Sequence, residues 1–150
     1  MILDSINNYN LSDDIFYLDE YSHLFLGKEG ELFKFEYKQG KHFFINKSVK
    51  RPINIISGLK INDGYYDLEG AYGYGGFLTN SDDEEFLLRA FDLYRTRCKE
   101  ENIISEFLRF HPFNNFPFKH FNHLDFRLHD RNVVVVDLNS NILDSLDKKV

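Results

Sequence analysis

The residues best suited to chemistry lie in two segments on either side of the clearest helix pattern in the chain. The first segment reads Ala71-Tyr72-Gly73-Tyr74-Gly75-Gly76-Phe77, an aromatic, glycine-rich turn where backbone can approach a ligand or another strand closely. The second covers residues 104–112 and sets Glu106, Arg109 and His111 among large apolar residues. Burying such groups costs several kcal/mol unless each finds a partner. Together the two segments predict a site.

Arg109 and His111 could hold an anion between them. Side chains of a strand alternate between its two faces, so these two are expected on the same face of a regular strand. The two expected faces comprise Ser105, Phe107, Arg109 and His111, and Ile104, Glu106, Leu108 and Phe110. An arginine fork beside an imidazole suits a carboxylate or phosphate group. The alternative is structural: the arginine pairs with a carboxylate of the fold, and the histidine caps a loop.

Glu106 is the weak candidate for a catalytic base. It falls on the apolar face of the expected strand. Burial without a close cation raises the pKa of a carboxyl group, which is the condition for a general base near neutral pH. A structural glutamate near a sheet edge produces the same pattern, so the catalytic residue stays unassigned.

Several common kinds of site are not supported by the motifs. The glycines at 73, 75 and 76 form neither a phosphate-binding loop nor a dinucleotide fingerprint, because the residues that must follow them are missing or misplaced. A turn or bulge that stacks Tyr72 and Tyr74 beside the sheet is favoured. No Gly-x-Ser-x-Gly elbow supports a Ser-His-Asp triad. No metal site is expected, since the histidines at 111, 120, 123 and 129 follow no metal-binding pattern.

Composition and charge indicate one globular domain over residues 1–150. The chain is 43% hydrophobic and 28% charged, which excludes a solvated disordered polymer. Its formal net charge of −6, without a dense basic run, argues against a nucleic-acid partner. Cys98 is the only cysteine, and its place on an apolar helix stripe predicts a buried, inert thiol in a reducing compartment. Neither a signal peptide nor a membrane-spanning run is recognised, so we expect a cytoplasmic protein.

Short patterns predict the elements before the glycine-rich turn. Residues 13–21 look like a short strand that runs into a helical turn. The β-rich runs 31–37 and 41–45 flank Gln39-Gly40, which predicts an antiparallel hairpin. Residues 53–58 are a further extended candidate, and residues 65–68 lead into the turn.

The best helix pattern covers residues 82–101. Ser81 and Glu84 have the spacing of a capping box, and Asn102 suits the exit because asparagine tolerates left-handed geometry. One buried stripe is expected to comprise Leu87, Ala90, Phe91, Tyr94 and Cys98.

Two strands are expected after this helix. Residues 103–110 form the first, and the apolar run 133–136 predicts a strand in the centre of a sheet. Between them, residues 111–132 suit a functional loop or an irregular hairpin. The tail around Ile142 and Leu146 begins an amphipathic helix. The fold class expected from these elements is α/β (α+β), with a mixed, largely antiparallel sheet and flanking helices.

The order of these segments resembles the N-terminal half of bacterial FemAB-like proteins of the GNAT superfamily. The matching segments are residues 15–21, 66–68, 72–76, 103–112 with Asn115, and 133–138. Family members are tandem acyltransferases linked to modification of the cell wall or of surface polysaccharide. They commonly have Ser-Pro before the Tyr-Gly-Tyr-Gly-Gly segment and Pro after it, whereas this chain has Gly70-Ala71 and Phe77.

The resemblance implies a GNAT-like fold and a place for the site. It implies that Tyr74, Glu106, Arg109 and His111 face an acceptor cleft, and Tyr72, Tyr74, Arg109 and His111 are the expected substrate-binding residues. Family members are about twice as long, and their second half carries the acyl-donor groove. We therefore expect this chain to bind no cofactor itself, with acyl-CoA or an aminoacyl donor belonging to the complete enzyme.

Two functions are compatible with this sequence. The first is an acyltransferase half that shapes the site for an amine acceptor, such as a small molecule, glycan or peptide precursor of the cell wall or surface polysaccharide. It would work with a C-terminal GNAT half. The alternative is a non-catalytic binding or assembly module, a degenerate half that self-associates as a homodimer through an exposed apolar face.

Overall fold

A long antiparallel hairpin forms the frame of the molecule. The computed structural model describes residues 10–61, 63–130, 132 and 133. Strand β1 (Glu31–Gln39) pairs with β2 (His42–Pro52) from Glu31 opposite Lys50 to Gln39 opposite His42. Gly40 takes a φ of 58° in the tight turn between them. The predicted hairpin is confirmed, with both strands longer than their β-rich cores.

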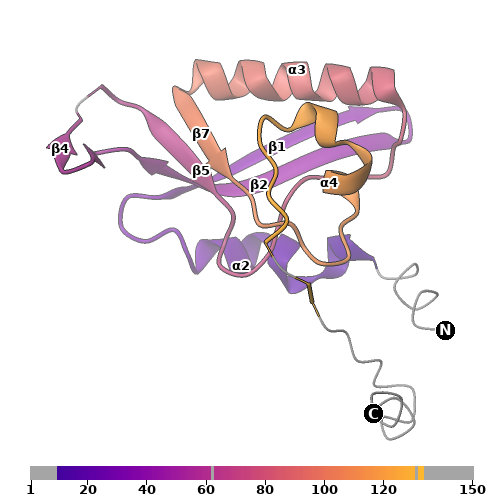
Figure 1. Ribbon diagram of the computed structural model, residues 1–150, viewed down its shortest axis with the longest axis horizontal. Coiled ribbons are helices and arrows are strands. Elements are labelled where there is room, and N and C mark those ends of the chain that lie inside the picture. Colours follow the sequence, from indigo (N-terminus) through magenta and orange to yellow (C-terminus); the bar gives the residue numbers. More distant parts are fainter. Residues whose placement is uncertain (1–9, 62, 131, 134–150) are drawn as a thin grey trace, which may run out of the picture.

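The sheet is mixed and mostly antiparallel, as expected. Its order is β1-β2-β5-β7, where β5 (Tyr66–Glu69) runs antiparallel to β2 and β7 (Ile103–Phe107) runs parallel to β5. The short strand β6 (Leu78–Thr79) pairs with the first half of β2. Strands β3 (Ile55–Ile56) and β4 (Leu59–Lys60) form a separate small hairpin at one end of the molecule (Figure 1). The extended segment expected at residues 53–58 therefore contains β3, the first strand of this hairpin.

Helix α3 (Glu84–Glu100) crosses from β6 to β7, as the periodicity predicts. The predicted capping box is wrong. Asp83 is the cap, and its carboxylate accepts the Phe86 N–H at 3.1 Å, while the Ser81 hydroxyl accepts the Asp83 N–H at 3.2 Å. Aspartate is as good a cap as serine, so the helix begins later than the spacing indicates. Asn102 has a φ of 55°, which confirms the left-handed exit.

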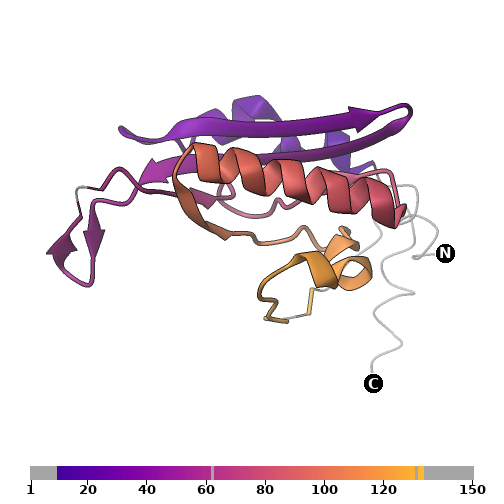
Figure 2. The same ribbon diagram turned by 90° about the horizontal axis from the view of Figure 1, so that it is seen from above.

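The core lies between α3 and one face of the sheet (Figure 2). Phe44, in the middle of β2, is fully buried and contacts Phe91 of α3 edge-on, with ring centroids 4.9 Å apart. Cys98 is half-buried beside this core, and burial raises the pKa of its thiol to about 11, so the expectation of an inert cysteine is supported. The buried core comprises Phe33, Phe44, Leu68, Phe77, Phe86, Leu87, Ala90, Phe91, Tyr94, Ile103 and Phe116.

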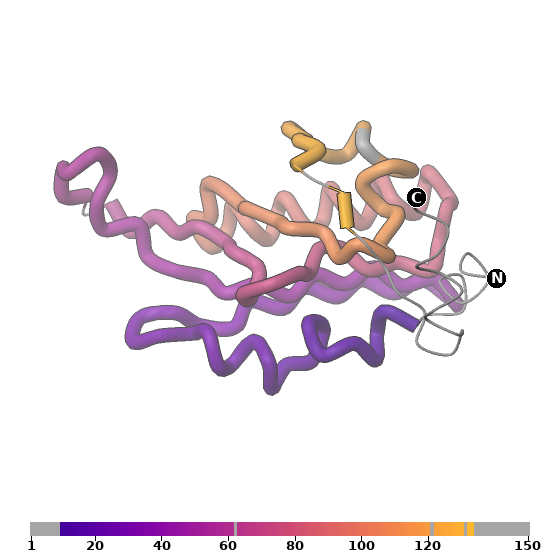
Figure 3. Tube along the Cα trace, turned by 60° about the horizontal axis from the view of Figure 1, so that its bottom comes forward, coloured from indigo at the N-terminus to yellow at the C-terminus, as the bar shows by residue number. Residues whose placement is uncertain are grey.

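Three short helical turns line the other side of the strands (Figure 3). They are η1 (Leu11–Asp13), η2 (Ile15–Tyr17) and α2 (Asp19–His23), so the strand expected within 13–21 is wrong. The physical reason is local. The side chains of Asn10 and Asp14 accept backbone N–H groups two residues ahead, at 3.3 and 2.9 Å, and these bonds favour tight turns over a strand.

An irregularity in β7 changes which of its residues face the core. Tyr66 of β5 pairs with Ile103, and the next residue, Asp67, pairs with Ser105, so Ile104 is an extra residue in the strand. Ile103 is buried and Ile104 is exposed, while Glu106 points toward the α3 side. The expectation that Ile104 and Glu106 share a face is therefore wrong. From Glu106 to Phe110 the expected alternation holds, because Leu108 and Phe110 pack against the core.

Residues 111–133 run without a strand in the part of the chain that the structure describes. They contain α4 (Phe116–Lys119) and the turn η3 (Phe121–His123), which lie beside α3 (Figures 1 and 2). Of the two sequence interpretations, a loop is therefore favoured over an irregular hairpin. Val133 is exposed and lies outside any strand. The rest of the strand expected at 133–136 and the helix near Ile142 fall outside the described residues.

Candidate functional site

The two segments singled out in the sequence meet at the end of the sheet. The Gly75 N–H donates to the Arg109 carbonyl at 2.8 Å, and the His111 N–H donates to the Gly75 carbonyl at 3.1 Å. These bonds form a parallel bridge between Gly75 and Phe110, beyond the ends of β5 and β7. The chain therefore leaves β5 at Gly70, bulges out at residues 71–74, and returns at Gly75 to pair with the segment that follows β7. We call this arrangement the junction.

Two glycines of the turn are required by aromatic packing. Gly73 and Gly76 have φ values of 103° and 99°, which side chains rarely adopt. A Cβ at Gly73 would collide with the ring of Phe16, and one at Gly76 would collide with the ring of Phe110. A Cβ at Gly75, by contrast, would meet nothing within 4 Å. The bend is thus shaped by η2 on one side and by the second segment on the other.

The two tyrosines of the bend have different surroundings. Tyr72 is largely exposed, its ring stacks on Phe25 with centroids 6.3 Å apart, and its carbonyl accepts the Tyr21 hydroxyl at 2.9 Å. Tyr74 is half-buried, with its ring 5.4 Å from Phe16 and 5.5 Å from His111. Tyr72 thus offers an aromatic surface to solvent, whereas Tyr74 belongs to an aromatic cluster at the base of the bend.

His111 is buried against η2. Its Nε2 lies 3.5 Å from a carboxylate oxygen of Asp14, and its Nδ1 is within 3.2 Å of the Phe113 N–H, which assigns Nδ1 as the acceptor in the neutral ring. Burial lowers the pKa of His111 below its ordinary value, while the Asp14 carboxylate opposes this shift. His111 thus lies in the junction with its imidazole buried near Asp14, whereas Arg109, the other residue expected to bind an anion, is exposed.

Arg109 is the exposed cation of the junction. Its backbone carbonyl is held by Gly75, and its side chain is exposed. Among the residues that the structure describes, no hydrogen bond or ion pair engages its guanidinium. The structural alternative, an arginine paired with a carboxylate of the fold, is therefore not seen in this part of the chain. The five donors of the guanidinium are available to a planar anion.

A clamp on the Gly75 carbonyl was missed by sequence reasoning. The Tyr17 hydroxyl donates to this carbonyl at 2.6 Å, and the Asn114 amide donates to the Tyr17 oxygen at 3.2 Å and to the Phe77 carbonyl at 2.9 Å. Burial raises the pKa of Tyr17 above its ordinary value, so its hydroxyl remains a donor. Asn114 directly precedes Asn115, the asparagine that belongs to the family resemblance. The resemblance therefore pointed to the neighbouring asparagine, and the residue that makes these contacts is Asn114.

Glu106 lies apart from the junction, on the α3 side of the sheet. Its carboxylate accepts from Asn46 at 2.7 Å, from Tyr94 at 2.7 Å and from Ser48 at 3.2 Å. Burial raises the pKa of Glu106, and these three hydrogen bonds oppose the shift. Because β2 and α3 enclose the carboxylate, it does not share a cleft with Arg109. We interpret Glu106 as a buried structural acid.

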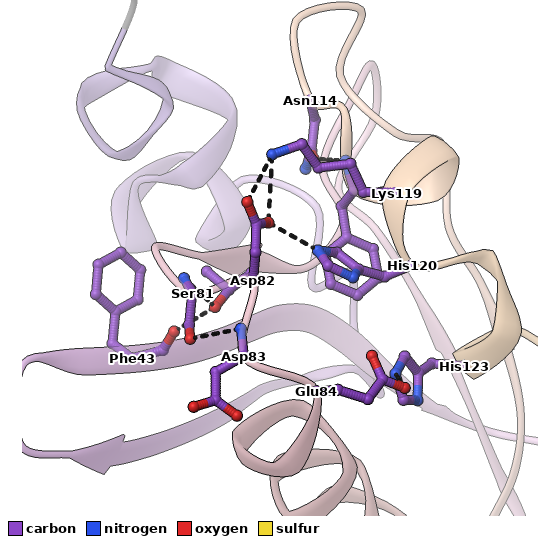
Figure 4. Close-up of polar contacts among 11 residues, drawn as sticks. Phe43, Ser81, Asp82, Asp83, Glu84, Asn114, Lys119, His120 and His123 are labelled. Carbon is purple, nitrogen blue, oxygen red and sulfur yellow. Dashed lines mark hydrogen bonds and ion pairs between the residues drawn. The ribbon is translucent and has the colours of Figure 1, made fainter.

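A cavity of about 260 Å³ lies behind the junction. Phe77 and Asn114 line it from the junction side, and Asp82, Lys119 and His120 line it near the start of α3 (Figure 4). The Asp82 carboxylate contacts both Lys119, at 2.9 Å, and His120, at 3.2 Å. No group of three or more His, Cys, Asp or Glu side chains suited to a metal ion occurs in the described part of the chain.

Comparisons with known proteins identify no relative. No protein-family model matches the chain, and no curated protein or solved structure matches it at a significant level. Within the described ranges, no helix combines the length and apolar character needed to cross a bilayer. What this chain does is therefore inferred from its own residues.

Proposed function

We propose that this chain is the acceptor-side half of an acyltransferase that transfers an N-acyl or aminoacyl group to an amine. The observation that carries the proposal is the junction: the Gly75–Phe110 bridge brings the tyrosine–glycine bend and Arg109 to one end of the sheet. These two segments are among those that carry the resemblance to FemAB-like proteins. The mixed sheet crossed by α3 is the architecture expected for such a half.

The residues of the junction suit acceptor binding better than bond making. In acyl transfer to an amine, the nitrogen forms a bond to the acyl carbon, the bond from that carbon to the donor's sulfur or oxygen breaks, and the amine loses a proton. This chain would hold the acceptor so that its amine is oriented toward the acyl carbon, which removes the need for the two reactants to meet by chance in the right orientation. Arg109 would hold an anionic group of the acceptor, and the exposed ring of Tyr72 would lie against an apolar face.

Acceptor binding tests the proposal directly. The probe is a lysine-containing UDP-muramyl pentapeptide, which carries an amine, carboxylates and phosphates, titrated into the chain by calorimetry. We expect Arg109→Ala to weaken binding about 10- to 100-fold, the range for losing hydrogen bonds to a charged group. Arg89→Ala is the matched control, because Arg89 is also exposed but lies on α3.

Two results would contradict this proposal. Equal losses in the two variants would mean that the peptide binds through net charge alone. A sharp loss of melting temperature in Arg109→Ala with unchanged affinity would assign the arginine a structural role.

The acyl donor provides a separate test. Because we assign this chain to the acceptor side, acetyl-CoA should show no saturable binding in the same calorimeter at concentrations up to about 1 mM. Saturable micromolar binding would show a donor groove in this chain and would overturn the assignment to the acceptor side alone.

The alternative, a self-associating module, is favoured by one feature of the surface. Strand β7 ends the order of the described sheet, and two of its apolar residues, Ile104 and Phe107, are 57% and 60% exposed. An apolar edge strand is a template for pairing with another chain. Sedimentation equilibrium of the wild type and of the Phe107→Glu variant distinguishes the self-associating module from the acyltransferase half. A concentration-dependent dimer that the substitution abolishes supports the module, and a monomer at high concentration excludes it.

A further inference from the structure

We propose that the cavity behind the junction binds a small zwitterion, namely an α-amino acid with an apolar side chain. The cavity measures about 260 Å³. Pockets for drug-sized ligands are roughly 300–1,000 Å³, so this one suits a smaller molecule. Its walls come from η1, from the stretch between β6 and α3, and from α4. Neither Tyr72 nor Arg109 lines it, so the proposal does not rest on acyl transfer.

The inner wall of the cavity is built from side chains that the fold already holds in place. Phe77 and Phe116 are 3% and 2% exposed and present aromatic rings. The Asn114 amide donates to the Phe77 carbonyl at 2.9 Å and accepts the Phe116 N–H at 2.9 Å. Because this wall is formed before a ligand arrives, binding requires little further ordering of the protein. The rings provide a surface for an apolar side chain.

An ion pair stands at the solvent side of the same cavity. Figure 4 shows the Asp82 carboxylate between Lys119 and His120, with Lys119 Nζ 2.9 Å from Oδ2 and His120 Nε2 3.2 Å from Oδ1. The Lys119 ammonium holds the pKa of Asp82 below its ordinary value, so this carboxylate is ionised at neutral pH. A carboxylate has about four lone-pair sites and an ammonium has three N–H donors. Each member of the pair can therefore take a second partner.

Two other polar groups of the lining have hydrogen-bonding capacity to spare. Within the part of the chain that the structure describes, the side-chain amide of Asn115 makes no hydrogen bond, although its backbone carbonyl accepts two N–H groups of α4 and the next residue. His120 Nε2 faces Asp82, and its Nδ1 makes no hydrogen bond to any described residue. A polar ligand thus meets both donors and acceptors here.

The balance of charges determines the class of ligand. Apart from His120, the charged side chains of the lining are one aspartate and one lysine, Asp82 and Lys119. A ligand with a single charge would pair with one of them and face the like charge of the other, which is unfavourable. An α-amino acid brings an ammonium for Asp82 and a carboxylate for Lys119 on one carbon. The apolar group on that carbon then packs on the aromatic wall.

Titration of the whole chain with L-valine, followed by the amide signals in NMR spectra, tests the proposal. We expect saturable binding in the sub-millimolar range, with shifts in residues 77–82 and 114–120 and none in the β1–β2 turn. Isovalerate lacks the amine of valine, and isobutylamine lacks its carboxylate. Each should bind about 10-fold more weakly or worse, because one charge of the ion pair then loses its partner in the ligand.

Two substitutions test the ion pair itself. Asp82→Asn and Lys119→Gln should each weaken binding of L-valine about 10-fold, the order expected for losing a hydrogen bond to a charged group. The two side chains are 67% and 47% exposed, so these changes preserve the fold. Asp92→Asn and Lys99→Gln are the matched controls, because both residues are exposed on α3 and neither lines the cavity. These controls should bind L-valine as the wild type does.

Three outcomes overturn the proposal. They are the absence of saturable binding at millimolar L-valine, equal affinity for L-valine and its two analogues, and unchanged affinity in both cavity variants. Equal affinity for the three ligands would mean that the cavity takes an apolar group without reading its charges. This comparison uses the wild-type chain alone, so it decides the question even where a variant fails to fold.

Discussion

The three glycines of the tyrosine–glycine bend have different tasks, although they look alike in sequence. Gly73 and Gly76 combine left-handed backbone with contact to the rings of Phe16 and Phe110, while the space beside Gly75 is open. What Gly75 contributes is its backbone, since both its N–H and its carbonyl are bonded. A side chain at Gly75 would leave these bonds in place.

This difference predicts opposite results for two neighbouring substitutions. Gly76→Ala should lower the free energy of unfolding by about 1–3 kcal/mol, because a positive φ and a collision with Phe110 add up. Gly75→Ala should be neutral or slightly stabilising, since it only reduces the freedom of the unfolded chain. Urea denaturation of both variants checks this. Equal losses would mean that the backbone of the bend differs from the one described.

At the residue scale, the sequence showed which groups need partners but not who the partners are. The burial of Glu106 was predictable from its apolar neighbours. Its partners were not, because Asn46 and Ser48 lie 60 and 58 positions away in the chain. Tyr17 meets Gly75 across 58 positions for the same reason. Such contacts follow from tertiary packing, which no local pattern encodes.

At the scale of elements, local patterns predicted what local forces determine. The β1–β2 hairpin and α3 follow from period and turn chemistry, and both are confirmed. The turns of residues 11–17 and the bulge at Ile104 were missed, because single side-chain hydrogen bonds and pairing with β5 decide them. The start of α3 was misplaced because Ser81 and Asp83 are both good caps, and only the structure distinguishes them.

The cap of α3 can be tested at this scale. Asp83→Ala should lower the free energy of unfolding by about 1 kcal/mol, the usual value for losing an N-cap carboxylate. Asp92→Ala, in the exposed middle of the same helix, should change it little, because alanine is a good helix former. Thermal melts monitored by circular dichroism compare the two. A larger loss at Asp92 would contradict the assignment of the cap.

At the scale of the whole molecule, the buried carboxyl of Glu106 links stability to pH. Its pKa is raised in the folded protein, so the folded state holds this proton more tightly than the unfolded chain does. That contribution is present at low pH and is lost as the pH rises from the ordinary carboxyl range through the raised pKa. His111, with its lowered pKa, acts in the opposite direction as the pH rises toward the ordinary histidine range.

Glu106→Gln isolates the contribution of this carboxyl, because His111 is present in both proteins. The difference in free energy of unfolding, variant minus wild type, should increase as the pH rises from 4 to 8. The amide retains an oxygen for Asn46 and Ser48, so the fold is preserved. Urea titrations at several pH values measure the difference. A constant difference across that range would show that folding does not raise the pKa of Glu106.

The clamp on the Gly75 carbonyl has a consequence for how the molecule assembles. It joins Tyr17, Gly75, His111 and Asn114, and closing the loops between such distant positions costs entropy before any contact is gained. The hairpin and helix, built from neighbours along the chain, can form beforehand. We therefore expect the junction to form in the last stage of folding. A partly folded chain would contain the β1–β2 hairpin and α3 but not the junction.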